Sequence, residues 1–164
     1  MTSAFTVRRL LAGLRRNLAL TVLLAACCTG VAIASPKTNP CELITRADAS
    51  KALGVPARPG IAYSASATPN GPKIGCVYFS PVGVVRVGFQ TGGRAAYDAS
   101  RKNAQPGETD LSGIGDAAYF IHSSIIAIKG TFMYVVTLTF QGQGEPPSAD
   151  HRLTTLAKKA ASRL

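Results

Sequence analysis

The chain has 164 residues, of which 18 are basic and 8 are acidic, so its formal net charge is +10 at neutral pH. Four of the basic residues lie in the first 34 positions, and the other 130 positions keep a net charge of +6, spread mostly as single residues, as is typical of a solvated surface. The sequence has no tryptophan and no basic stripe interleaved with aromatic residues, which argues against nucleic acid as a partner.

Residues 1–34 have the pattern of a secretory signal peptide. Basic pairs ending at Arg16 precede an apolar run from Leu18 to Ala34. The run closes in Ala-Ile-Ala, which is a small-x-small cleavage site. We expect cleavage between Ala34 and Ser35, which would release the rest of the chain into an extracytoplasmic, periplasmic or secreted, oxidising environment.

Two alternatives to soluble release stay open. The stretch Leu24-Ala25-Ala26-Cys27 fits the lipobox of bacterial lipoproteins, with Cys27 as the lipidated residue, although the chain stays apolar beyond it. The apolar run is also near the lower length for a membrane span, about 17–25 residues, so an uncleaved anchor is the third reading. Contact with a membrane is expected only in these two cases.

Cys41 and Cys76 are the cysteines that remain after cleavage at Ala34. An isolated pair in an exported domain predicts one disulfide. The rival readings are a metal pair, which needs further ligands, and a redox dithiol, which normally has Cys-x-x-Cys spacing.

After a short linker at residues 35–40, residues 41–164 are expected to form a single domain. Asn39-Pro40-Cys41 predicts a turn. Thr45 and Asp48 have capping-box spacing and predict a helix that ends at Gly54. Further along, the pattern predicts an edge strand within 61–67, strands at 76–79 and 84–89, and a helix over 94–104.

The C-terminal part predicts strands at 117–122, 125–129 and 132–140, followed by a helix. In the longest strand, alternate residues from Phe132 to Phe140 should face the core. Ser148 should cap the terminal helix, whose apolar stripe comprises Leu153, Leu156, Ala157, Ala160 and Leu164. The expected fold class is α+β, with an antiparallel sheet of five or six strands covered by helices.

The segment Asn39-Pro40-Cys41-Glu42-Leu43-Ile44-Thr45 resembles the opening of a group of small bacterial envelope domains of unknown function, many of them actinobacterial lipoproteins. Two further anchors match: Gly75-Cys76-Val77-Tyr78, and the turn Gly113-Ile114-Gly115-Asp116-Ala117-Ala118. The match spans about residues 39–164. It implies a disulfide between the two matching cysteines and is compatible with a sheet-and-helix sandwich like that of PsbP-type domains. It implies no activity.

Motifs for catalysis, cofactor binding or metal binding do not rise above background. Gly113-Ile114-Gly115-Asp116 precedes a strand-like run, so it predicts a turn rather than a phosphate loop. His122 and Asp150-His151 show no nucleophile arrangement. We therefore expect a non-enzymatic cell-envelope module that binds a protein, peptide or small ligand through one sheet face or the loop 68–73. The alternatives are an inhibitor of an extracytoplasmic hydrolase, acting through that loop, and a hydrolase with an unrecognised site.

Overall fold

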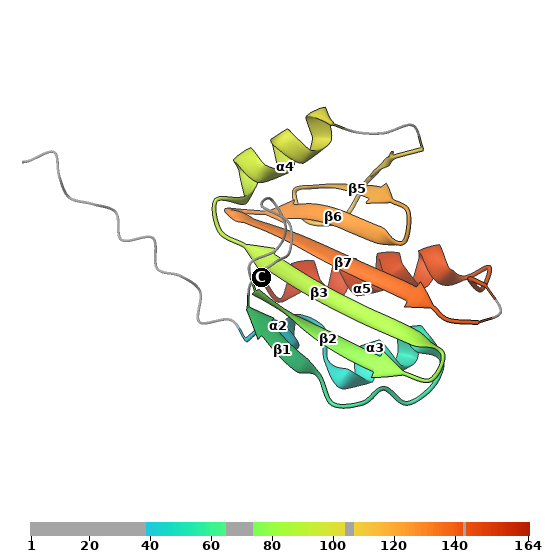
Figure 1. Cartoon of the computed structure of the whole chain (residues 1–164). Helices are drawn as coiled ribbons and strands as arrows, with labels where there is room; N and C mark the ends of the chain where they lie inside the picture. The colour runs from blue at the N-terminus through green and yellow to red at the C-terminus, as the bar shows by residue number, and fades with distance from the viewer. Residues whose placement is uncertain (1–38, 65–73, 104–106, 143) are drawn as a thin grey trace, which may run out of the picture. The chain divides into compact units, whose positions relative to one another are not determined.

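Seven strands form one antiparallel sheet in the computed structural model of the protein, which describes residues 39–64, 74–103, 107–142 and 144–164 (Figure 1). The expected signal peptide, its cleavage site and Cys27 lie outside these residues. The strands are β1 (Ile61–Ser64), β2 (Ile74–Ser80), β3 (Gly83–Gln90), β4 (Thr109–Leu111), β5 (Ala117–Ile121), β6 (Ser124–Lys129) and β7 (Phe132–Phe140). The helices are α2 (Pro40–Leu43), α3 (Arg46–Leu53), α4 (Gly93–Lys102) and α5 (Ala149–Ser162).

The α+β class and the antiparallel sheet are confirmed, but the expected count of five or six strands is wrong. The strand order is β1-β2-β3-β7-β6-β5-β4. The candidate strand at 61–67 is present as β1 over its first four residues. The additional strand is β4, which has only three residues and pairs with β5. Its sequence, Thr-Asp-Leu, is too short and too polar to show the alternation that identifies a half-buried strand.

The main core lies between one face of the sheet and the helices α2, α3 and α5. β3 pairs along its whole length with β7 at the centre of the sheet, and Val87 lies opposite Val136. Of the alternate residues of β7 expected to point inward, Tyr134, Val136 and Leu138 are fully buried there, whereas Phe132 and Phe140 are partly buried and pack against this core. Figure 1 shows α3 and α5 behind the sheet on this side. Four of the five residues of the α5 stripe are fully buried, and Leu164 packs at the margin.

The fourth helix, α4, lies on the opposite face and packs on β6 and β7. Its Tyr97 forms a second, smaller cluster with Tyr119, Ile128 and Met133. Met133 and Tyr134 are neighbours in one strand, and their side chains therefore enter different cores on the two faces of the sheet. Three helices, α2, α3 and α5, therefore cover one face of the sheet, whereas α4 alone packs on the other.

Local capping signals account for the position of α3. The Thr45 side chain accepts a hydrogen bond from the Asp48 backbone N–H, and the Asp48 carboxylate accepts one from the Thr45 N–H, which completes the predicted capping box. Gly54 ends the helix in the left-handed conformation.

Two further predictions about the helix ends need correction. The predicted turn at Asn39-Pro40-Cys41 is the start of the one-turn helix α2, whose N-cap is Asn39, because the Asn39 side chain accepts a hydrogen bond from the Cys41 N–H and Pro40 fits the first helical position. Ser148 precedes α5 as predicted, but its side chain makes no capping hydrogen bond.

The turn before β5 requires glycine at one position, and this allows a specific prediction. Gly115 has a φ of +60°, and a Cβ atom there would lie 2.3 Å from the carbonyl oxygen of Ile128. We expect Gly115→Ala to lower the free energy of unfolding by about 2–3 kcal/mol, from the left-handed conformation and the backbone clash together. Urea unfolding measures the change.

Gly113→Ala is the matched control. Gly113 also has a positive φ, +72°, but a Cβ atom there would meet nothing within 4 Å. Its substitution should cost only the conformational part, about 1 kcal/mol. Equal losses in the two variants would contradict the proposed clash with Ile128.

Candidate functional site

Cys41 and Cys76 form the predicted disulfide. The two Sγ atoms are 2.09 Å apart and the Cα atoms 5.1 Å apart. The bond joins α2 to β2, which is the second strand in the order of the sheet, and Cys76 is fully buried. It therefore fixes the N-terminal helical segment to the sheet and leaves neither sulfur free as a thiolate ligand.

Tyr78, two residues further along β2, holds the same segment by hydrogen bonding. Its hydroxyl lies 2.9 Å from the carbonyl oxygen of Cys41 and also contacts the carbonyl oxygen of Ile44. Burial raises the pKa of the Tyr78 phenol, and the nearby Asp48 carboxylate acts in the same direction. The hydroxyl thus stays protonated and acts as a structural donor.

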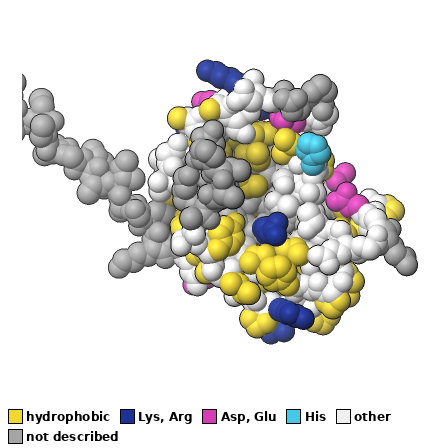
Figure 2. All heavy atoms as spheres, in the orientation of Figure 1, with side chains coloured by type: hydrophobic (Ala, Val, Ile, Leu, Met, Phe, Trp, Pro, Cys, Tyr) yellow, Lys and Arg dark blue, Asp and Glu magenta, His cyan; other side chains and the backbone are white. Residues whose placement is uncertain are grey.

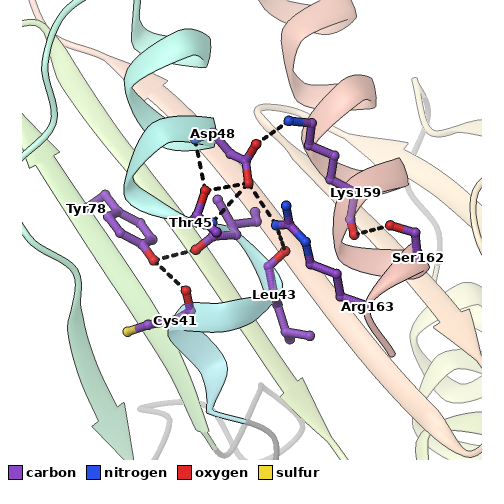
Figure 3. Close-up of polar contacts among 9 residues, drawn as sticks. Cys41, Leu43, Thr45, Asp48, Tyr78, Lys159, Ser162 and Arg163 are labelled. Atoms are coloured by element: carbon purple, nitrogen blue, oxygen red, sulfur yellow. Dashed lines mark hydrogen bonds and ion pairs between the residues drawn. The ribbon is translucent and has the colours of Figure 1, made fainter.

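Among the carboxylates of the described residues, Asp48 has the most strongly shifted pKa. Figure 3 shows its partners around it: Thr45 at the N-cap of α3, Lys159 on α5 and Arg163 directly after α5. Its side chain is 6% exposed. One oxygen pairs with Lys159 and the other lies 2.7 Å from Arg163, which also donates to the carbonyl oxygen of Leu43. Burial alone would raise the pKa of Asp48, but the hydrogen bonds from Lys159, Arg163 and Thr45 outweigh it and hold the pKa well below its usual range.

The second feature is the part of the sheet that faces away from α2, α3 and α5. Directly paired residues of antiparallel strands project to the same face. Ile61 pairs with Val77, Val77 with Arg86, and Arg86 with Thr137, so these residues form one row across the sheet. Neighbouring rows hold Tyr63 and Phe79. We call the surface made by Ile61, Tyr63, Val77, Phe79 and Arg86 the β1–β3 face.

This face carries both of the large apolar side chains that are exposed among the described residues. Ile61 is 58% exposed and Phe79 is 37% exposed. Figure 2 shows hydrophobic side chains around an isolated basic group over this region. Arg86 is exposed and, within the described part of the chain, makes no hydrogen bond or ion pair. An apolar surface around an unpaired guanidinium suits contact with another molecule better than contact with water.

Tyr63 adds an aromatic ring at the edge of the same face. A Cβ atom on Gly75 would lie 2.3 Å from the ring and the hydroxyl of Tyr63, so the ring rests on that glycine. Burial raises the pKa of the Tyr63 phenol, and the positive charge of Arg86 opposes the rise. The charge of Arg86 therefore acts at the Tyr63 hydroxyl, and both groups belong to one surface.

The other residues that drew attention in the sequence lie apart from one another. His122 is exposed in the tight turn between β5 and β6, with a φ of +50°, and His151 is exposed in the first turn of α5. Among the residues that the structure places, no serine or threonine hydroxyl bonds to either imidazole. Gly113 to Asp116 forms the predicted turn, and Asp116 accepts a hydrogen bond from the Gly130 N–H. The loop 68–73 lies outside the described residues.

In the described ranges, no three histidine, cysteine, aspartate or glutamate side chains are grouped so that they could hold a metal ion. In the same ranges, no helix has the length and hydropathy needed to cross a membrane.

No protein-family model, curated protein or solved structure matches this chain. The resemblance of its opening segment to bacterial envelope domains therefore stays a prediction.

Proposed function

We propose that the chain is an exported, non-enzymatic domain of the bacterial cell envelope that binds a protein partner through the β1–β3 face. The observation that carries the proposal is the position of Ile61 and Phe79. They are the large apolar side chains left exposed among the described residues, and the pairing register puts both beside Arg86 on one face.

The composition of the face favours a protein partner. Aromatic residues and arginine are enriched at the centres of protein interfaces, where a few of them contribute most of the binding energy. The face offers Tyr63, Phe79 and Arg86 on regular strands, which hold their side chains in fixed positions. The complementary partner surface is apolar with a carboxylate opposite Arg86, because an unpaired guanidinium buried at an interface is costly.

Export is supported by two independent features. Residues 1–34 have a signal-peptide pattern, and disulfides such as Cys41–Cys76 persist mainly in oxidising compartments. The α+β arrangement is also compatible with the PsbP-like sandwich that the resemblance implies.

The experiment compares the wild-type protein with Phe79→Ser and Arg86→Glu variants as immobilised baits for an envelope extract. We expect wild type to retain a specific protein, and each substitution to weaken its binding about tenfold or more. The retained protein is then purified, and its affinity for each variant is measured by calorimetry.

Lys158→Glu is the matched control, since it reverses an exposed charge on α5, on the other side of the sheet. It should leave binding unchanged. The proposal is overturned if no protein is retained, or if Lys158→Glu and Arg86→Glu weaken binding equally.

A further inference from the structure

A pocket of about 310 Å³ lies between α3 and α5, on the helical side of the sheet and away from the β1–β3 face. Its volume is at the lower end of the range typical of small-molecule sites. Its floor includes the apolar side chains of Ala52 and Leu156. The remaining lining residues are polar or charged: Asp48, Lys51, His151, Arg152, Thr155 and Lys159.

The single carboxylate in the lining is already neutralised. Asp48 is buried and its two oxygens are taken by Thr45, Lys159 and Arg163 (Figure 3). Its low pKa keeps it ionised, and both of its oxygens already accept hydrogen bonds from within the protein, so its charge is balanced by Lys159 and Arg163. The Asp48 carboxylate therefore provides little attraction for a cationic ligand.

The basic side chains, in contrast, retain free donors. Lys51 is exposed and makes no hydrogen bond or ion pair with the described residues. Arg152 uses Nη1 to donate to the carbonyl oxygen of Ala52 at 3.0 Å, which fixes the guanidinium and leaves its other N–H groups available. Lys159 has a side chain that is 40% exposed, and its ammonium group pairs with Asp48.

The charges of the lining sum to an excess of positive charge. Lys51, Arg152 and Lys159 contribute three cations against the one carboxylate of Asp48, while the hydroxyl of Thr155 already donates to the carbonyl oxygen of His151. A guanidinium and two ammonium groups that line one pocket match the negative charge of a phosphate group. The apolar floor suits a small hydrophobic body attached to that group.

We propose that the α3/α5 pocket binds a phosphate group carried on a small apolar body, with Lys51 and Arg152 as its principal ligands. The proposal goes beyond the partner-binding function and uses different residues. Such a group could come from a free phosphate ester or from a phospholipid headgroup.

The natively processed protein is purified and titrated in a calorimeter, once with phenyl phosphate and once with inorganic phosphate. We expect phenyl phosphate to bind more tightly, because it also fills the apolar floor. Lys51→Gln should weaken its binding about tenfold. Lys158→Gln, which removes an exposed charge from α5 outside the pocket, should leave binding within about twofold of wild type.

A second arm uses vesicles of phosphatidylcholine with and without phosphatidylglycerol. Vesicle binding that requires the anionic lipid and is weakened by Lys51→Gln identifies the headgroup as the source, whereas phenyl phosphate binding without vesicle binding identifies a free ester. The proposal is overturned if phenyl phosphate does not bind, or if Lys51→Gln and Lys158→Gln weaken it equally. The two proposals can fail separately, because the partner-binding test changes residues of the β1–β3 face and this test changes a residue of the α3/α5 pocket.

Discussion

Reduction of the Cys41–Cys76 disulfide is expected to lower the free energy of unfolding by about 4 kcal/mol. The bond closes a loop with a sequence separation of 35 residues, and the loss of this constraint releases chain entropy in the unfolded state. For a urea dependence of about 2 kcal/mol/M, the unfolding midpoint should fall by about 2 M. Equilibrium unfolding with and without a phosphine reductant measures the shift.

The control for this experiment is the double variant Cys41→Ala, Cys76→Ala. It should unfold near the midpoint of the reduced wild type and should not respond to reductant. The interpretation fails if reduction shifts the wild-type midpoint by less than about 0.5 M, because the loop constraint would then contribute little.

Asp48→Asn should lower the free energy of unfolding by about 2–4 kcal/mol near neutral pH. The substitution removes the charge that pairs with Lys159 and Arg163 and weakens the cap of α3. Breaking a buried ion pair typically costs about 3–5 kcal/mol, and we expect less here because both cations are partly exposed. Asp98→Asn, which breaks only the exposed i,i+4 pair with Arg94, should change stability by about 0.5 kcal/mol or less.

The same substitution should change the response of the protein to acid. The pKa of Asp48 is lowered by folding, so its contribution to stability is complete above the usual aspartate pKa of about 4 and is lost as the pH falls towards the folded-state pKa. The stability difference between wild type and Asp48→Asn should therefore shrink from about pH 5 to about pH 2. A difference that stays constant over this range would show that the ionised carboxylate is not the stabilising species.

Local patterns in the sequence were sufficient to predict the helices and strands that have a strong hydrophobic periodicity or a capping signal. The alternation from Phe132 to Phe140 predicted which side of β7 enters the main core, and the spacing of Thr45 and Asp48 predicted the start of α3. The disulfide also followed from cysteine number and export. β4 was missed because three mostly polar residues carry no measurable period.

The candidate surfaces could not be predicted in the same way, because they depend on tertiary placement. Asp48 was recognised as a cap, but its partners Lys159 and Arg163 lie 111 and 115 residues further along the chain. No local sequence pattern connects these two residues with Asp48. One sheet face was expected to bind a ligand, but the grouping of Ile61, Phe79 and Arg86 became visible only with the strand order and register.

One of the two outermost strands, β4, is also the shortest strand among the described residues, with three residues. A foreign chain that extends a sheet needs a long row of unpaired main-chain groups on which to align, and this short edge offers only a few. Self-association by strand addition at the β4 edge, with the amyloid-type stacking that can follow, is thereby disfavoured. The exposed hydrophobic side chains of the β1–β3 face lie at the opposite end of the strand order, away from this edge.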